Sequence, residues 1–266
     1  MSAKKKRSSW TLGADPELLL ADTRTGACAA VEDLVTGTKD KPEKLVDMGR
    51  GFAIQADNVA LEFNVPPSTS WEVFHNNINS AVEYCANLVR NRSEGRVELS
   101  AAAERLYMQS ALTHPNSQMF GCSPEFDAYT SERVAVPDRE ALVDKTTGGE
   151  WRFGGGHVHI GIDRSEEIPP HVMAQFSDLF LGLRSLGYDK QPQRRKFYGQ
   201  AGRFRPTKYG FEYRVLSNSW VVNREIGQQV AYQSAHLAGF LSRRPIPELQ
   251  RLTREIAWGD VANFIN

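Results

Sequence analysis

Alternating polar and apolar residues predict four strands, each with polar groups on one face. In residues 11–20, Gly13, Asp15 and Glu17 share one parity, and side chains two residues apart point to the same face of a strand. Pro16 has no N–H to donate to a strand ladder. We therefore expect this strand to lie at a sheet edge or to carry a bulge at Pro16.

The run 51–67 shows the clearest alternation along the chain and is predicted to be one strand. Its apolar positions are Val59, Leu61, Phe63 and Val65, and the positions on the opposite face are Asn58, Ala60, Glu62 and Asn64. One face should therefore pack in the core while the other forms a polar surface. Asp57 has the wrong parity to join Glu62 unless a bulge rotates it.

Two later strands repeat this pattern. In "EWRFGGGHVHIGI", residues 150–162, His157 and His159 share one face, and in "YGFEYRVLSN", residues 209–218, Glu212 and Arg214 do so. The three glycines before His157 would let the backbone approach a ligand closely.

Helical spacing of apolar residues predicts helices over 71–90, 169–187, 223–242 and 246–257. A basic loop is expected at 194–208, and loops that could cover a site are expected over 93–150. Polar-faced strands interleaved with helices indicate an α+β fold with a mostly antiparallel sheet backed by helices. We expect a single domain over residues 10–266, preceded by a basic, disordered tail over 1–9 that contains "KKKR".

Composition narrows the class of protein. Hydrophobic residues make up 41% and charged residues 24% of the chain, as in a globular protein with a substantial core. Thirty-two basic residues balance 32 acidic ones, which argues against nucleic acid or a membrane as the main partner. The three cysteines, Cys28, Cys85 and Cys122, show no metal spacing or disulfide framework. Because there is also no signal peptide or long apolar run, we expect a cytoplasmic protein.

The polar faces of the four strands share one kind of chemistry. Carboxylates and imidazoles that converge from several strands can hold a divalent cation such as Mg²⁺, which prefers oxygen ligands, and that cation would offset their mutual repulsion. A basic cluster suited to a polyphosphate consists of Arg195, Arg203, Arg205, Lys208 and Arg214. Taken singly, each residue could equally have a purely structural role, as a solvated strand position, a hydrogen-bonded histidine or an exposed arginine. Because such residues occur on four strands, a metal- and phosphate-binding site is favoured.

Four segments together resemble a known family. They are "GADPE", "DNVALEFNVPP", "GGGHVHIGI" and "RRKFYGQAGRFRPTKYGFEYRVLSN", and in this order they are similar to the phage type-2 COOH-NH2 ligases of the glutamine synthetase and glutamate-cysteine ligase superfamily. The resemblance covers roughly residues 10–240. It implies a glutamine-synthetase-like sheet, curved into a half-barrel, that holds ATP and Mg²⁺ or Mn²⁺ ions.

The resemblance also implies roles for individual residues. The metal ligands would be Asp15, Glu17, Glu62, His157 and Glu212, with Glu62 and Arg214 in the catalytic machinery. Nucleotide contacts would come from Arg195, Arg203, Arg205, Lys208, Arg214, His159 and Asn64. The segment "ADPE" stands where the superfamily commonly has two glutamates flanking one residue, so the role of Asp15 and the metal count stay open.

The function implied is ATP-dependent amide or peptide bond formation between a small-molecule or peptide carboxylate and an amine, through an acyl phosphate. One alternative is a phosphotransferase, because the same architecture serves guanidino kinases. Another is a cysteine amidase in which Cys122 is the nucleophile, and a third is a phage or host interaction module without turnover. Residues 93–150, with Cys122, Glu125 and Asp127, are the predicted specificity region; the substrates and the oligomeric state are not readable from the sequence.

Overall fold

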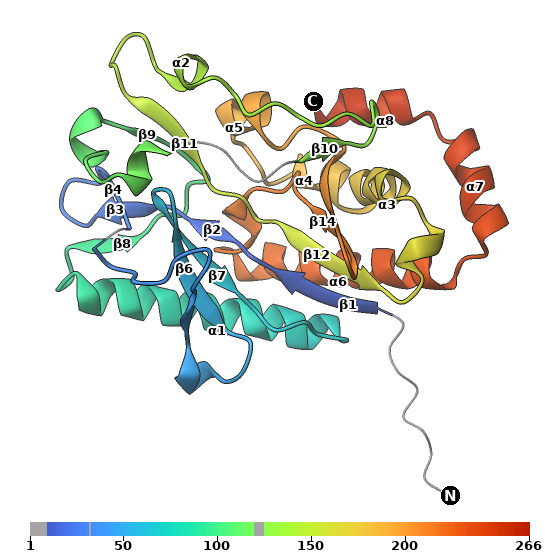
Figure 1. Ribbon diagram of the computed structural model, residues 1–266, viewed down its shortest axis with the longest axis horizontal. Coiled ribbons are helices and arrows are strands. Elements are labelled where there is room, and N and C mark those ends of the chain that lie inside the picture. The colour runs from blue at the N-terminus through green and yellow to red at the C-terminus, as the bar shows by residue number, and fades with distance from the viewer. Residues whose placement is uncertain (1–9, 32, 120–124) are drawn as a thin grey trace, which may run out of the picture.

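The computed structural model describes residues 10–31, 33–119 and 125–266 (Figure 1). The predicted tail over residues 1–9 and Cys122 lie outside the described residues. Within them, helices are combined with sheets whose paired strands all run antiparallel. The predicted α+β class is therefore confirmed, while the glutamine-synthetase-like curvature stays a prediction.

A five-stranded sheet and a four-stranded sheet form the centre of the fold. The first has the order β1 (Trp10–Ala14), β12 (Val158–Ile162), β14 (Gly210–Tyr213), β13 (Arg203–Thr207) and β10 (Phe126–Asp127). The second has the order β2 (Glu17–Leu18), β7 (Ala60–Asn64), β6 (Ala53–Asp57) and β5 (Glu43–Lys44). The chain passes from the edge of one sheet to the edge of the other at Asp15 and Pro16, so the interruption expected at this proline is confirmed.

Residues 51–67 form a hairpin rather than the single strand that their alternation predicted. Asn58 has a φ of 54°, a left-handed conformation that asparagine adopts more readily than most residues. The chain therefore reverses between β6 and β7, and Gln55 lies opposite Glu62 while Asp57 lies opposite Ala60. The reversal removes the parity argument against Asp57, because Asp57 and Glu62 occupy different strands.

Two smaller sheets occupy part of the region that was expected to be loops. One has the order β4 (Cys28–Ala29), β3 (Leu20–Asp22) and β8 (Val97–Leu99), and the other pairs β9 (Glu104–Tyr107) with β11 (Glu150–Phe153). The short helix α2 (Arg139–Leu142) lies between β10 and β11 in the chain. Residues 93–150 are thus more structured than predicted, because their strands pair with partners distant in sequence.

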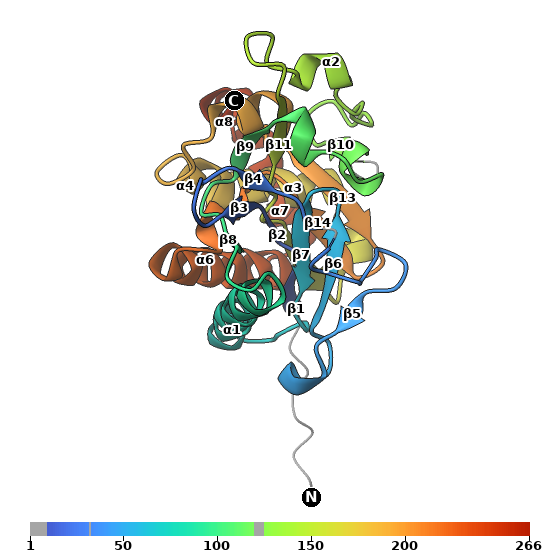
Figure 2. The same ribbon diagram turned by 90° about the vertical axis from the view of Figure 1, so that its left-hand side faces the viewer.

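Two long helices lie side by side against the strands (Figures 1 and 2). They are α1 (Trp71–Arg92) and α6 (Arg224–Arg243), close to the predicted spans. Ser70 and Asn223 cap their first turns, since each side chain accepts a hydrogen bond from a backbone N–H. Helix α6 contacts β1 and β12, and α3 (Pro170–Ser177) contacts β13 and β14.

The remaining helices depart in part from the sequence prediction. The predicted helix 169–187 continues from α3 through a π-helical turn, η5 (Asp178–Gly182), into α4 (Leu183–Ser185). The predicted basic loop 194–208 contains instead the end of α5 (Pro192–Phe197) and strand β13. Helix α7 (Ile246–Glu255) matches a predicted span, whereas α8 (Trp258–Ile265) was not expected. Short 3-10 turns are η1 (Val46–Met48), η2 (Gln109–Ala111), η3 (Asn116–Gln118), η4 (Ser165–Glu167) and η6 (Asn218–Trp220).

The π-helical turn carries a carboxyl group into the core. Asp178 is fully buried and accepts hydrogen bonds from the hydroxyl groups of Tyr129, at 2.6 Å, and Tyr213, at 2.5 Å. Burial raises the pKa of Asp178 to about 7. This contact links the helix to β14 and to the segment that follows β10.

The apolar side chains of the five-stranded sheet face the helices. Leu12, Ile160 and Phe211 lie side by side on adjacent strands and are fully buried. Because side chains alternate along a strand, the residues between them project from the opposite face. None of the helices among the described residues is both long and apolar enough to cross a membrane.

Candidate metal and active site

The strand register aligns polar residues across the face of the five-stranded sheet that points away from the helices. His159 lies opposite Gly13 on one side and Glu212 on the other, and Glu212 lies opposite Arg205. Asp15 directly follows β1 and His157 directly precedes β12, so both flank the paired residues Ala14 and Val158. Local alternation and antiparallel pairing together are therefore enough to gather these side chains.

The first cluster consists of Asp15, His157 and Glu212. One potential ligand atom from each lies within 4.8 Å of the other two. The Nδ1 atom of His157 is 3.6 Å from Oδ1 of Asp15 and 3.3 Å from Oε1 of Glu212. His157 and Glu212 are buried, and Asp15 is largely so. The three groups can approach one cation without a large backbone movement.

The second cluster consists of Glu17, Asp57 and Glu62, whose ligand oxygens also lie within 4.8 Å of one another. Glu17 lies opposite Glu62, and Glu62 lies opposite Gln55. Asp57 reaches the cluster from the end of β6. Its parity in the sequence argued against membership, but the hairpin brings it beside the two glutamates.

Mutual repulsion is strong in the second cluster. Burial raises the pKa of Glu62 well above its ordinary value, and the charges of Asp15, Asp57 and Glu17 raise it further. Burial also raises the pKa of Glu17, with the charge of Asp57 contributing, although His157 and the Gly155 N–H oppose the shift. Two glutamates whose pKa values are raised, beside a third carboxylate, fit a divalent cation, because its positive charge favours the charged form of each glutamate.

The first cluster contains its own counter-charges. Burial alone would raise the pKa of Asp15, but the charge of His159 and hydrogen bonds from His157 and His159 outweigh burial and lower it. Burial opposes charging of His159, yet Asp15, whose Oδ1 is 3.0 Å from Nε2, raises the pKa of this imidazole. The ring of His159 also contacts the hydroxyl group of Tyr209 at 2.8 Å. The carboxylates of this set suit Mg²⁺ or Mn²⁺, whereas imidazole nitrogen is a ligand typical of transition metals.

Two arginines of the predicted basic cluster reach the site. Arg205 donates from Nε to Oε2 of Glu212 at 2.7 Å, and Arg214 donates from Nε to Oε2 of Glu125 at 3.1 Å. Arg214 also pairs with Glu212. Arg203 lies farther out, 3.9 Å from Glu125. These guanidinium groups place positive charge beside the first cluster, where an anionic ligand would meet it.

Five of the predicted nucleotide-binding residues line neither of the two pockets that open on the clusters: Arg195, Arg203, Lys208, His159 and Asn64. Arg195 donates to the carbonyl groups of Gly199 and Ile265 and pairs with Asp189. Lys208 is exposed in the turn between β13 and β14, and Asn64 ends β7. Arg194, the neighbour of Arg195, does line one of these pockets, the larger one described below. Its guanidinium group donates hydrogen bonds to the carbonyl groups at positions 215 and 216, each at 2.8 Å.

The glycines before His157 make close protein contacts, and Gly155 also lines the larger pocket, so their approach to a ligand stays a prediction. A Cβ on Gly156 would lie 2.2 Å from the carbonyl oxygen of Ser217, and one on Gly155 would lie 2.3 Å from Nε2 of His157. The Gly155 N–H donates to Oε2 of Glu17 at 2.8 Å. This segment therefore positions one ligand from each cluster.

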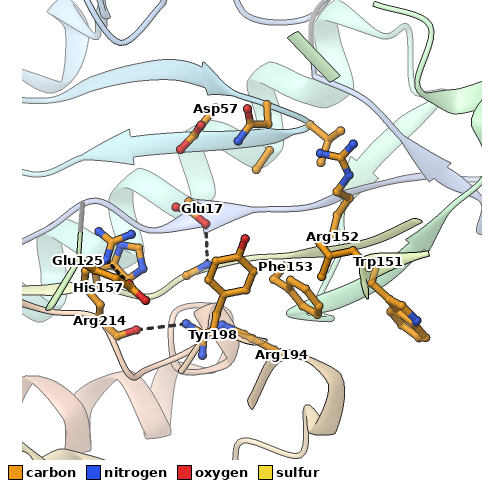
Figure 3. Close-up of a pocket in the computed structure, with 15 residues that line it drawn as sticks. Glu17, Asp57, Glu125, Trp151, Arg152, Phe153, His157, Arg194, Tyr198 and Arg214 are labelled. Atoms are coloured by element: carbon orange, nitrogen blue, oxygen red, sulfur yellow. Dashed lines mark hydrogen bonds and ion pairs between the residues drawn. The ribbon is translucent and has the colours of Figure 1, made fainter. Parts of the chain in front are cut away.

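Two pockets open on these groups. The smaller pocket borders both clusters, and its lining also includes Lys39, Gln55, Arg205 and Arg214. The larger has about 660 Å³ of free space within its outline and the smaller about 530 Å³, and in both pockets this space is partly open to solvent. Figure 3 shows Asp57, Glu17, His157 and Arg214 toward one end of this pocket and Trp151 and Phe153 toward the other, with Tyr198 between them. A ligand with a charged part and a planar apolar part matches this lining.

Several lining residues had no signal in the sequence. Lys39 and Tyr198 come from segments without strand alternation, and Gln55 has the parity of the apolar face of the predicted strand 51–67. Glu125 was assigned only to a specificity loop, yet it directly contacts Arg214. Trp151 and Phe153 could have been found as alternate positions of β11, because aromatic residues beside a glycine-rich segment are suited to ligand contact.

One family model matches part of the chain. Residues 144–251 match the model of a family of ligases that join a carboxyl group to an amine. That family is described as phage phiEco32-like COOH.NH2 ligase, type 2. The match confirms the resemblance that the sequence motifs indicated. It covers the part of the chain that carries His157, Glu212 and Arg214, while Asp15 and the second cluster lie outside it. A search of curated proteins finds no significant match.

Proposed function

We propose that the protein is an ATP-dependent carboxylate-amine ligase. In this reaction the substrate carboxylate attacks the γ-phosphate of ATP and ADP leaves; the amine then displaces phosphate from the acyl phosphate and loses a proton, which leaves an amide. The family match supports the ligase class. The observation that carries the rest is the pair of carboxylate clusters, one on each of the two central sheets, with two arginines beside the first cluster.

The two clusters would hold Mg²⁺ or Mn²⁺, which when bound would stabilise negative charge on phosphoryl oxygens. Arg205 and Arg214 lie next to Glu212, so their charges would help to orient a polyphosphate. The aromatic residues of the larger pocket would exclude water from an apolar part of a ligand. The proposed substrates are small molecules or peptides, and the proposed metal ligands remain those of the two clusters.

Product analysis distinguishes this proposal from a phosphotransferase on the same fold. The assay would measure ADP and inorganic phosphate released from Mg²⁺ and ATP in the presence of pooled small carboxylates and amines. A ligase yields both products in equal amounts together with an amide, whereas a kinase yields ADP and a phosphorylated acceptor. Glu62→Gln should abolish the release, and Glu98→Gln, at an exposed position of β8, should leave it unchanged.

Two results would contradict the ligase proposal. ADP release without inorganic phosphate would favour phosphotransfer. The absence of both products, together with no ATP binding by calorimetry, would favour an interaction protein without turnover.

A further inference from the structure

A tight turn over residues 38–41 projects a lysine toward the second cluster. Thr38 and Lys41 exchange backbone hydrogen bonds of 3.1 Å in both directions, so Lys39 and Asp40 form the tip. The carbonyl oxygen of Gly37 accepts a hydrogen bond from the Ala56 N–H at 2.9 Å, which fixes the turn against β6. The position of Lys39 therefore follows from backbone contacts.

The base of this turn is also held in place. A Cβ on Gly37 would lie only 2.2 Å from the carbonyl oxygen of Ile54, so a larger residue would force the turn away from the strand. Thr36 donates from Oγ1 to Oε2 of Glu43 at 2.9 Å, and Arg92 of helix α1 donates to the same oxygen at 3.1 Å. The turn is anchored at both ends, and the side chain of Lys39 extends from its tip to Asp57.

The ammonium group of Lys39 lies at the second cluster. Its Nζ is 2.8 Å from Oδ1 of Asp57, and the side chain lines the smaller pocket while staying 49% exposed. Asp57 itself is buried. Lys39 thus differs from Arg214, which is buried between Glu125 and Glu212.

The second cluster cannot hold this ammonium group and a divalent cation on the same Asp57 oxygen without strong repulsion. A lysine has a flexible four-carbon stem and three donors, so a half-exposed one can exchange partners at small cost. Once a metal occupies the cluster, the anions within reach are the phosphoryl oxygens that the metal would bind.

We propose that Lys39 is a phosphoryl-binding residue of the ligase site, paired with Asp57 in the metal-free protein and with a phosphoryl oxygen in the metal-nucleotide complex. This inference rests on the proposed function and adds a residue to its machinery. Lys39 also has a direct consequence for metal binding, because its charge competes with the cation for Asp57.

The test compares Lys39→Met with Lys41→Met, a lysine on the same turn that is exposed and that lines neither of the two pockets. Free Mn²⁺ is measured by electron paramagnetic resonance without nucleotide, and ATP binding is measured by calorimetry with Mg²⁺. For Lys39→Met we expect Mn²⁺ to bind about two- to fivefold more tightly, the range for a partly exposed ion pair. ATP should bind about tenfold more weakly, as for one lost charge-assisted hydrogen bond. Lys41→Met should match the wild type, and Lys39→Arg should keep the wild-type Mn²⁺ affinity.

Failure of this inference differs from failure of the proposed function. Wild-type protein that binds neither Mn²⁺ nor ATP would overturn the ligase proposal and this inference with it. If the wild-type protein binds both Mn²⁺ and ATP, and Lys39→Met binds each with the wild-type affinity, only the role of Lys39 would be overturned. Thermal unfolding of each variant verifies that the fold is intact.

Discussion

Replacing Glu62 by glutamine should stabilise the protein in the absence of metal. Glu62 is buried beside Asp57 and Glu17, with ligand oxygens within 4.8 Å of one another. At that separation, and with an effective dielectric constant of ~20, one pair of carboxylates repels by about 3 kcal/mol. Lys39 offsets part of the repulsion, and partial protonation of Glu62 relieves more. We therefore expect glutamine, of nearly the same shape, to raise the free energy of unfolding by about 1–3 kcal/mol.

Thermal unfolding followed by circular dichroism, with and without Mg²⁺, measures this effect. A gain of 1–3 kcal/mol corresponds to an increase in Tm of about 2–10 °C for a chain of this size. Because the pKa of Glu62 is raised in the folded protein, wild-type stability falls as pH increases above the ordinary glutamate value. The advantage of the variant should therefore grow from pH 5 to pH 8. Mg²⁺ should raise the Tm of the wild type through binding, and it should raise the Tm of Glu62→Gln by less, because only the first cluster is intact in that variant.

Glu98→Gln is the matched control, since Glu98 is exposed on β8 and its replacement should change stability by less than about 0.5 kcal/mol. A lower Tm for metal-free Glu62→Gln, or an undiminished Mg²⁺-dependent increase, would refute the electrostatic argument. The first result would mean that Glu62 makes net favourable contacts without a cation, and the second that the cation binds elsewhere.

Two further substitutions examine the groups around the site. In Gly155→Ala, the new Cβ would lie 2.3 Å from Nε2 of His157 and should displace the imidazole, so we expect about tenfold weaker Mn²⁺ binding by calorimetry. The control is Gly259→Ala, where nothing lies within 4 Å of the new Cβ and Mn²⁺ should bind as in the wild type. Equal Mn²⁺ affinities of Gly155→Ala and the wild type would show that His157 is not a ligand. Asp178 has a folded pKa of about 7, so wild-type stability should fall as pH rises toward 7. Asp178→Asn should remove that loss, a relative gain of about 2–3 kcal/mol between pH 5 and pH 8 in urea unfolding, and parallel pH profiles would contradict the assignment.

The sequence alone determined which residues project from the polar face of each strand. Parity along a strand is a consequence of local backbone geometry, so His157 and His159, or Glu212 and Arg214, can be paired before any tertiary structure is known. The long helices α1 and α6 were also predicted closely, because their apolar spacing and capping residues lie within the segments themselves.

Only the tertiary structure divided these polar residues between two clusters. Asp15 and Glu17 have the same parity, but the chain leaves one sheet between them and enters another, so they join different clusters. Asp57 joins the second cluster because the chain reverses at Asn58. A change of sheet and a reversal depend on pairing with strands distant in sequence, and alternation does not encode that register.

For the basic residues, too, the sequence determined one part of the site and the tertiary structure decided another. The sequence identified a cluster of positive charge, yet neighbouring arginines differ in role: Arg194 lines the larger pocket, whereas Arg195 binds the carbonyl group of Ile265. Lys39 reaches the site because Gly37 allows its turn to approach β6 closely. Sequence periodicity determined which faces are polar, and the contacts between segments distant in the chain decided which charged groups meet, because long flexible side chains take their positions from packing and loop closure.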